Sequence, residues 1–371
     1  MQRHPPSTIC LAMIVRDEAH IIARCLESVR PFVSHWVICD TGSVDDTCVR
    51  SRAAMAGIPG QVYHHHWEDF GHNRTMALQL ARASGCDYIL VIDADEVLAV
   101  EDQSVLVDLT ADSYRIEMRF PDIRYPSVRL LRSGCDWSYR GTIHEYPVSQ
   151  VPATEVVLDS SKIYLWTDGM GARGRSGTKG AGDLAVLEKA VVDEPLNPRY
   201  WFYLAQSYEM CGRVDDAILA YSKRTLIGDY LEEVWYSHYR MAQLCMTRGD
   251  WRSAVMHYLD AFSCLPSRAE PLYHMARGYH NRQLDQVALM FLEQAVVIPK
   301  PISALFVEAA IYDYLRWVDY ASVLWNTGEH EAACEIAEKV LASGKTPDNY
   351  LPVLRAIVEA VTPREASEVP A

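Results

Sequence analysis

The chain has 371 residues, of which 49% are hydrophobic and 23% are charged. This composition is typical of a soluble globular protein, and the length suggests two domains. The formal net charge of −14 argues against a protein that binds nucleic acid or anionic membranes by general electrostatic attraction.

The ten cysteines form no C-x-x-C pair, and most of them lie inside apolar periodic segments. They predict buried thiols in a reducing compartment rather than a disulfide framework or a zinc site. The N-terminal segment lacks the apolar core of a signal peptide, and no segment approaches the roughly 20 apolar residues that span a bilayer. We therefore expect a cytoplasmic protein without a transmembrane segment.

Short apolar strands alternate with helical patterns in the first part of the chain. We expect strands at residues 9–15, 35–40, 61–67 and 88–92, with helices at 18–29, 45–56 and 70–83 between them. This alternation predicts an α/β domain over residues 1–167, with a doubly wound sheet that binds ligands at the carboxyl ends of its strands. Further strands, mixed in direction, are expected near residues 114–119, 128–131 and 163–166.

Residues 168–182 contain six glycines in fifteen positions, a composition that we expect to prevent a regular element. One interpretation is a flexible linker. The other is a lid over a bound nucleotide, because Arg173, Arg175 and Lys179 would bring positive charge to its phosphates. The two interpretations are compatible.

Residues 183–371 show helical periodicity and an internal repeat. The segment that runs from Gly212 to Ala217 recurs from Gly249 to Ala254, and then more loosely from Gln283 and from Gly328. A helix–turn–helix unit of about 34 residues with small residues at the helix crossings resembles a tetratricopeptide repeat. We expect three regular repeats and one degenerate unit that caps them.

The most informative short segment is the apolar run 88–92 followed by Asp93, Ala94 and Asp95. Side chains alternate along a strand, so the two carboxylates are expected to emerge on the same side. Such a pair is costly unless a cation lies between its members. Mg²⁺ or Mn²⁺, which shares oxygen ligands with substrate phosphates, is the natural candidate.

Other polar residues follow the neighbouring strands. Arg16 and Glu18 come after the first strand, Asp40 ends the second, and Arg74 lies in the helix that precedes the diacid. The ends of parallel strands cluster at one edge, so these residues predict a single pocket. Asp40 could accept a hydrogen bond from a nucleotide base, and Arg74 could neutralise a diphosphate. Asp40 in an Asx-turn and Arg74 in a helix-surface ion pair are the alternatives.

Four segments together resemble the inverting family 2 glycosyltransferases of the GT-A fold. They are residues 10–18, 36–47, 73–78 and 92–96. With the attached repeats, the chain is similar to the peptide S-glycosyltransferases of glycosylated bacteriocins. One departure is Asp17, which stands before Glu18 where the family has asparagine.

The resemblance implies a nucleotide-sugar donor, with a UDP-sugar favoured, and a Mn²⁺ or Mg²⁺ ion. The implied donor contacts are Val15, Arg16, Glu18, Asp40, Arg74, Asp93 and Ala94. The implied metal ligands are Asp93 and Asp95, with His144 as a further ligand or a phosphate contact. The alternative for His144 is a hydrogen-bonded core histidine.

Inversion requires a base that deprotonates the acceptor. The sequence offers Asp136, His144 and Glu145. We favour Glu145, because the related enzymes have a "Gly-x-x-His-Glu" segment at a similar distance after the diacid. Trp137 could stack on a sugar face, or it could be part of the core.

We therefore expect a metal-dependent inverting hexosyltransferase whose repeats present a peptide or protein acceptor. Residues 183–371 carry 26 acidic and 17 basic residues, a net of −9, which disfavours a nucleic-acid acceptor and favours a basic peptide. The repeats could also join two chains into a homodimer. Alternatives are a glycan, lipid-linked or nucleic-acid acceptor, a nucleotidyltransferase, and an inactive transferase-like domain carried on a repeat scaffold.

Overall fold

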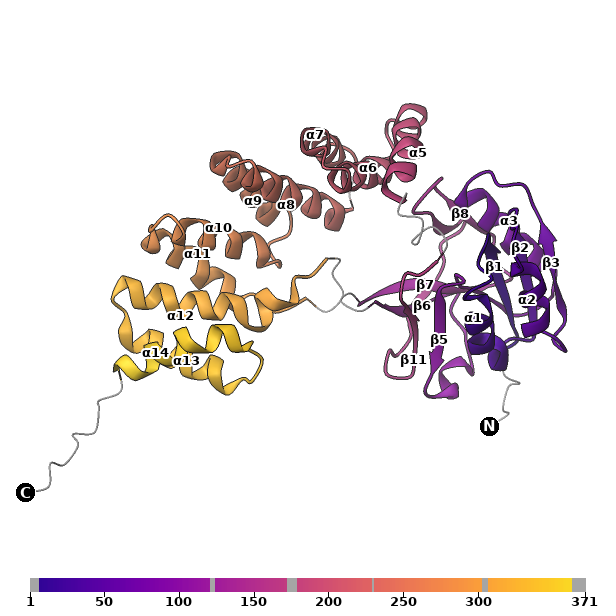
Figure 1. Ribbon diagram of the computed structural model, residues 1–371, viewed down its shortest axis with the longest axis horizontal. Coiled ribbons are helices and arrows are strands. Elements are labelled where there is room, and N and C mark those ends of the chain that lie inside the picture. Colours follow the sequence, from indigo (N-terminus) through magenta and orange to yellow (C-terminus); the bar gives the residue numbers. More distant parts are fainter. Residues whose placement is uncertain (1–6, 121–123, 172–178, 229, 302–305, 362–371) are drawn as a thin grey trace, which may run out of the picture. The chain divides into compact units, whose positions relative to one another are not determined.

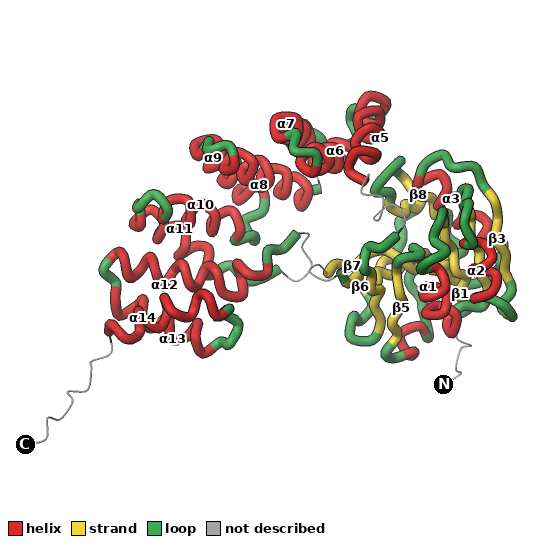
Figure 2. Tube along the Cα trace, in the orientation of Figure 1, coloured by secondary structure: helices red, strands yellow, loops and turns green. Residues whose placement is uncertain are grey.

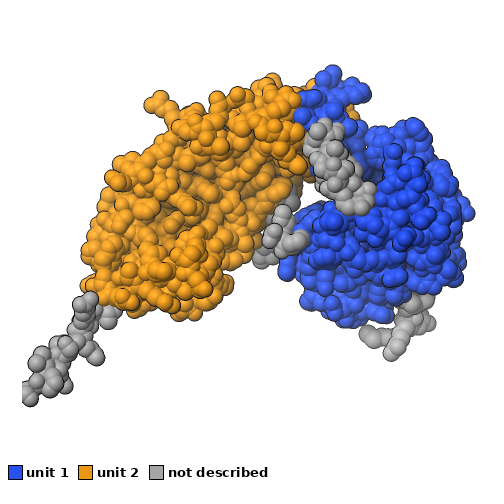
Figure 3. Space-filling model, in the orientation of Figure 1, with its two compact units in different colours: residues 1–193 blue, residues 194–371 orange. Residues whose placement is uncertain are grey.

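The computed structural model describes residues 7–120, 124–171, 179–228, 230–301 and 306–361. The chain forms two compact units, Met1–Asp193 and Glu194–Ala371 (Figure 3). The first unit is built on a mixed sheet flanked by helices, and the second is helical (Figure 1). The predicted fold class, an α/β domain followed by an all-α repeat domain, is confirmed.

Within the described residues, nine strands form the main sheet of the first unit in the order β3-β2-β1-β4-β7-β6-β11-β5, with β10 beside β6. Strands β3, β2, β1 and β4 run parallel, β7 runs antiparallel to β4 and β6, and β11 runs antiparallel to β5. The bounds are β1 (Ile9–Val15), β2 (His35–Asp40), β3 (Gly60–His64), β4 (Tyr88–Val91), β5 (Glu96–Val100), β6 (Ser113–Arg119), β7 (Arg124–Arg132), β10 (Glu155–Val157) and β11 (Ile163–Thr167).

Helices cover both faces of this sheet because β1 is apolar on both of its sides. Leu11 and Met13 pack in one core with α1 (Ile22–Val29), and α2 (Thr47–Ala54) lies against α1. Cys10 and Ala12 pack in the opposite core with α3 (Phe70–Arg82). A two-stranded hairpin of β8 (Trp137–Arg140) and β9 (Tyr146–Ser149) lies beside α3. The short 3-10 turns η1 (Arg30–Phe32) and η2 (Gln103–Leu106) complete the unit.

The glycine-rich segment 168–182 was expected to contain no regular element, but its last residues are helical. Helix α5 (Lys179–Asp193) begins inside it, so the glycines at 180 and 182 do form part of a regular element. The two compact units divide after α5, at residues 193 and 194, whereas the predicted start of the second domain, residue 183, lies inside this helix. Arg173 and Arg175, two of the expected phosphate contacts, lie outside the described residues.

The second unit consists of helices that pack in consecutive pairs (Figure 2). The pairs are α6 (Pro198–Met210) with α7 (Val214–Thr225), α8 (Leu231–Thr247) with α9 (Trp251–Cys264), α10 (Glu270–His280) with α11 (Asp285–Val297), and α12 (Arg316–Thr327) with α13 (His330–Ala342). A π-turn η3 (Ile311–Leu315) precedes α12, and η4 (Asp348–Tyr350) leads into α14 (Leu351–Val361). No helix in the described ranges is both long and apolar enough to cross a membrane.

The repeated sequence motif marks the turn inside each pair. Its first residue has a left-handed backbone in all four copies: φ is 71° at Gly212, 76° at Gly249, 60° at Gln283 and 92° at Gly328. The alanine five positions later is fully buried in every copy; these residues are Ala217, Ala254, Ala288 and Ala333. The repeat read from the sequence is therefore a structural repeat, because one position needs a left-handed turn and the other needs close helix contact.

Gln283 is the one copy of the motif that places a side chain in the left-handed conformation, which costs an L-residue about 1–2 kcal/mol. We expect Gln283→Gly to relieve this strain. The net gain in stability should be up to about 1 kcal/mol, because the greater entropy of glycine in the unfolded state offsets part of it. The reciprocal change, Gly249→Gln, should destabilise it by about 1–2 kcal/mol. Urea unfolding of the two variants checks this, and a loss of stability in Gln283→Gly would contradict it.

Candidate active site

The loops that follow β1 and β2 are hydrogen-bonded to each other. Thr41 donates from its backbone N and its Oγ1 to the carbonyl oxygen of Val15, at 3.0 and 3.1 Å. Asp17, with φ of 58°, receives a hydrogen bond from Val44 N at 2.8 Å and donates its own N–H to Ser43 Oγ at 3.0 Å. Asp17, the departure from the family pattern, therefore fastens the two loops together.

Glu18 belongs to the same connection, because its backbone N donates to Thr47 Oγ1 at 2.7 Å. Arg16 is exposed, with its Nε 4.0 Å from an oxygen of Asp17. The carbonyl of Val15 already accepts two hydrogen bonds, so a nucleotide could contact this loop more readily through Arg16 than through that carbonyl.

Asp40, at the end of β2, is buried within a turn. Its carboxylate accepts hydrogen bonds from Ser43 N at 3.1 Å and contacts His64 Nδ1 at 3.1 Å. Burial acts to raise the pKa of Asp40, but hydrogen bonds from Ser43 and His64 outweigh burial and hold that pKa below its ordinary value. Ligand atoms of Asp40, Cys48 and His64 lie within 4.8 Å of one another, but the structure already uses the carboxylate to close the turn.

The diacid does not leave a strand as predicted, because β4 ends at Val91 and a tight turn follows. Glu96 N donates to Asp93 O at 3.0 Å, and Asp93 N donates to Glu96 Oε2 at 2.8 Å. Ala94 points into the core with 5% exposure. The turn gives Asp93 and Asp95 different partners.

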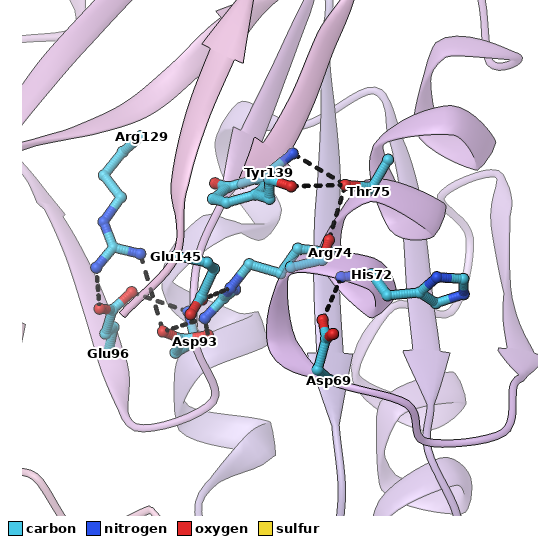
Figure 4. A network of polar contacts seen from close by, with 10 residues as sticks. Asp69, His72, Arg74, Thr75, Asp93, Glu96, Arg129, Tyr139 and Glu145 are labelled. Atoms are coloured by element: carbon cyan, nitrogen blue, oxygen red, sulfur yellow. Dashed lines mark hydrogen bonds and ion pairs between the residues drawn. The ribbon is translucent and has the colours of Figure 1, made fainter. Parts of the chain in front are cut away.

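Asp93 is paired with Arg74 from α3 (Figure 4). Arg74 Nη2 donates to both carboxylate oxygens, at 2.8 and 3.0 Å, and Arg74 Nε donates to Glu145 Oε1 at 2.5 Å. The side chains of Arg74 and Glu145 are each only 10% exposed. Burial alone would raise the pKa of Asp93, but the charges of Arg74 and Arg129 keep it below its ordinary value.

A second arginine, Arg129 from β7, completes this buried cluster (Figure 4). Arg129 Nη2 donates to Glu96 Oε1 at 2.6 Å, and Nη1 lies 3.9 Å from Asp93 Oδ2. Burial raises the pKa of Glu96 to about 7 against the attraction of Arg129, and the negative charges of Asp93 and Asp95 add to the rise. Arg74 and Arg129 therefore form ion pairs with three carboxylates, those of Asp93, Glu96 and Glu145.

The first turn of α3 brings Arg74 to the cluster. Asp69 caps the helix by accepting from His72 N at 2.7 Å, and Thr75 Oγ1 accepts from Tyr139 N at 2.9 Å, which ties the helix to β8 (Figure 4). A Cβ on Gly71 would lie 2.4 Å from the carbonyl oxygen of Gly141, so only glycine permits this approach. The loop after β8 thereby carries Glu145 to the guanidinium of Arg74.

Asp95 lies against the segment that leaves β11. Its Oδ2 is 3.4 Å from Thr167 Oγ1, and a Cβ built on Gly171 would lie 3.4 Å from the same oxygen. Burial, and then repulsion by Asp93, raises the pKa of Asp95. Within the described residues Asp95 forms no ion pair, in contrast to Asp93. Arg24 and His20 secure the covering segment: Arg24 Nη1 donates to Asp168 at 2.9 Å, and His20 Nε2 lies 3.1 Å from Met170 O.

Two predicted site residues do not join this cluster. Asp136 pairs with Arg82 at the far end of α3 at 2.8 Å, and its side chain is 61% exposed. Trp137 is 6% exposed and packs in the core between the sheet and α3, so it cannot stack on a sugar in this structure. Asp136 precedes β8 and Trp137 is its first residue, whereas Glu145 follows the strand, so β8 separates both residues from Glu145.

His144 is half-buried with a left-handed φ of 54°. Among the described residues, the ligand atoms of His144, Asp93 and Asp95 do not come together as a group of three. A metal at this site would therefore depend chiefly on Asp95, with ligands supplied by the substrate and by water.

Sequence reasoning missed Arg129 and the buried role of Glu96. The available signal was Arg129 itself, a charged residue between Val128 and the apolar pair Leu130 and Leu131. An arginine in a strand that crosses the middle of a sheet needs an acidic partner. Its partner, Glu96, is adjacent to the diacid.

Residues 10–126 match the model of the family described as Glycosyl transferase family 2. This match covers β1 to β4 and the strand ends described above. The first unit therefore carries a family 2 glycosyltransferase domain, and it is joined to a unit of tetratricopeptide-like helix pairs.

Two curated relatives contain comparable sequence. A TPR repeat-containing protein of Synechococcus elongatus is 33% identical over 169 residues, which are 43% of this chain and 40% of the relative. The prophage-derived glycosyltransferase SunS of Bacillus subtilis is 22% identical over 227 residues, which are 57% of this chain and 51% of SunS. The chain thus spans about half the length, or less, of the curated relatives that it matches.

Solved structures similar to this chain include the MamA protein, at 15% identity and a TM-score of 0.37, over 46% of this chain and 86% of that chain. Another is the C-terminal part of a TPR repeat-containing protein from Cytophaga hutchinsonii, at 13% identity and a TM-score of 0.38, over 50% of this chain and 69% of that chain. The repeat character of the second unit rests on its own helix pairs and turn motif.

Replacing Arg74 tests the cluster. We expect Arg74→Met, which keeps the apolar stem, to destabilise the protein by about 3–5 kcal/mol, because Asp93 and Glu145 would lose their shared buried partner. Arg82→Met is the matched control on the same helix, since its pair with Asp136 is exposed and should contribute about 1 kcal/mol or less. Equal losses for the two variants in chemical unfolding would contradict the assignment.

Proposed function

We propose that this protein transfers a sugar, with inversion, from a nucleoside-diphosphate donor, and that the donor is a UDP-sugar. The observation that carries the proposal is the meeting of the β1, β2 and β4 ends within a family 2 glycosyltransferase domain. The carboxyl ends of parallel strands are where such sheets bind nucleotides. The loops beyond β1 and β2 would receive the nucleoside, with Asp40 at their base, and Asp95 would lie nearest the diphosphate.

A divalent cation fits Asp95 better than Asp93. Both oxygens of Asp93 are engaged by Arg74, whereas Asp95 lacks a cationic partner among the described residues and its pKa is raised. Mg²⁺ or Mn²⁺ would relieve this repulsion and would complete its shell with phosphate oxygens and water. When bound, such an ion supplies positive charge to the leaving diphosphate.

Glu145 is the acid that we propose as the base for the acceptor. Of the two acids in the 134–145 segment, Glu145 reaches the cluster, whereas Asp136 is remote. Arg74 fixes the position of Glu145 through a hydrogen bond to Oε1, which leaves Oε2 to take the proton of the acceptor. His144 would contact the phosphates or the acceptor beside it.

We propose a peptide or protein as the acceptor, presented by the helical repeats. The acidic balance of residues 183–371, a net of −9, favours a basic segment. Self-association through the repeats is part of the same proposal. A transferase-like domain without activity is the competing function, and it predicts no release of nucleoside diphosphate from any donor.

The first test concerns the metal. We expect UDP with Mn²⁺ or Mg²⁺ to raise the melting temperature of the wild type more than UDP alone, because a ligand that binds the folded state stabilises it. Asp95→Asn should lose this metal-dependent increment, and Asp136→Asn, the matched exposed acid, should retain it. An unchanged increment in Asp95→Asn would rule out Asp95 as the metal ligand, and a larger shift with GDP or ADP would change the donor.

The second test concerns the base. General base catalysis contributes about 10²–10⁴-fold, so Glu145→Gln should lower the rate of nucleoside diphosphate release in the presence of acceptor by that factor. Binding of UDP and metal should be preserved, because glutamine can still accept from Arg74. Asp136→Asn again serves as the control. If Glu145→Gln lost nucleotide binding along with its rate, its role would be structural.

A further inference from the structure

The hairpin of α8 and α9 holds three side chains whose ligand atoms converge. Asp260 Oδ2 lies 3.8 Å from His238 Nδ1 and 3.9 Å from His257 Nδ1, and the three ligand atoms lie within 4.8 Å of one another. His238 comes from α8, whereas His257 and Asp260 are one turn apart on α9, which lies beside it (Figure 2). The set therefore spans both helices of one repeat.

These contacts are too long to be hydrogen bonds, which join N and O at about 2.7–3.2 Å. The Nδ1 atoms of His238 and His257 are both buried and have no hydrogen-bond partner within the described residues. A buried polar atom without a partner costs about 1–3 kcal/mol, so a ligand that bound both atoms and the carboxylate would recover part of this energy.

The separations suit a metal ion between the ligands. Zinc binds imidazole nitrogen and carboxylate oxygen at about 2.1 Å, so two ligands of one ion lie at most about 4.2 Å apart. The two separations from Asp260 Oδ2, 3.8 and 3.9 Å, fall inside this limit, and the two Nδ1 atoms lie within 4.8 Å of each other. Burial also lowers the pKa of both histidines, which favours the neutral imidazole that metals bind.

The repeat architecture does not require these residues. At the positions of the other hairpins that correspond to His257 and Asp260, counted from the buried alanine of the motif, the sequence has Ala220 and Lys223, Phe291 and Gln294, and Ile336 and Lys339. None of these pairs could bind a metal. The ligand set is thus particular to one hairpin.

We propose that His238, His257 and Asp260 form a binding site for a divalent transition-metal ion of the zinc class. Two imidazoles and one carboxylate suit Zn²⁺ or Ni²⁺ rather than Mg²⁺, which prefers oxygen ligands. Because the Asp260 side chain is 55% exposed, the site is open on one side, and water or a donor group of a partner would complete the coordination. The ion would link α8 to α9. This proposal is independent of the one for glycosyl transfer.

The test uses tag-free full-length protein in excess Mg²⁺, which occupies sites built from oxygen ligands. Zinc is titrated by calorimetry, and bound metal is measured after equilibrium dialysis. We expect one saturable zinc ion per chain that His257→Asn and Asp260→Asn both lose. His280→Asn is the control, because His280 pairs with Asp285 on the next helix and its side chain has a similar exposure, 30% against 27% for His257.

Zinc should also raise the melting temperature of the wild type and of His280→Asn, and leave Asp260→Asn unchanged. Asp260 is exposed, so Asp260→Asn is expected to fold, and circular dichroism confirms this before the titration. Equal zinc affinity in wild type and Asp260→Asn, or no binding by the wild type, would overturn the proposal, and the second result would indicate a bridging water in place of the ion.

Discussion

The buried contact of Arg74 with Asp93 and Glu145 is the constraint on which the rest of the first unit depends. Three segments far apart in sequence supply these charges: the start of α3, the turn after β4 and the loop after β8. A carboxylate taken out of water without a partner is strongly unfavourable. The position of α3 and the return of the loop at 141–145 are thus both set by the need to bring one guanidinium to two acids. Arg129 serves Glu96 and Asp93 in the same way from β7.

This arrangement divides the two acids of the diacid motif. Asp93 is used to hold the fold together, because its charge is balanced by arginines of the protein itself. Asp95, two residues later, has no cationic partner among the described residues. Burial and the charge of Asp93 disfavour its ionised form and raise its pKa. An external cation stabilises a site most where the protein leaves negative charge uncompensated. In this structure that place is Asp95, although the two residues look equivalent in sequence.

Much of the fold could be predicted from local patterns. The apolar runs place β1, β2 and β4 within a residue or so. The repeat motif predicts the turn inside each helix pair of the second unit, because a left-handed residue and a buried alanine are both local requirements.

The predictions that were wrong concern contacts between segments far apart in the sequence and one local exception. The glycines at 180 and 182 do not prevent α5. Asp136 and Glu145 seem interchangeable by sequence distance from the diacid, but a four-residue strand spans about 13 Å and brings only Glu145 to Arg74. Which arginine meets which acid depends on strand order, and the antiparallel insertion of β7 beside β4 has no local signature.

The same electrostatic rule distinguishes the acidic cluster of the first unit from the histidine cluster of the second. In the first, the protein supplies its own cations: Asp93, Glu96 and Glu145 each accept a hydrogen bond from an arginine, and Asp95 alone of the neighbouring acids is left without one among the described residues. In the second, two imidazole nitrogens and a carboxylate approach one another and stop short of bonding, with no arginine or lysine paired with Asp260 in the described residues. His280 and Asp285, in contrast, are in direct contact at 2.5 Å. The two gaps to Asp260 are too wide for hydrogen bonds and narrow enough for a pair of metal–ligand bonds, so they are compatible with an ion between the three groups.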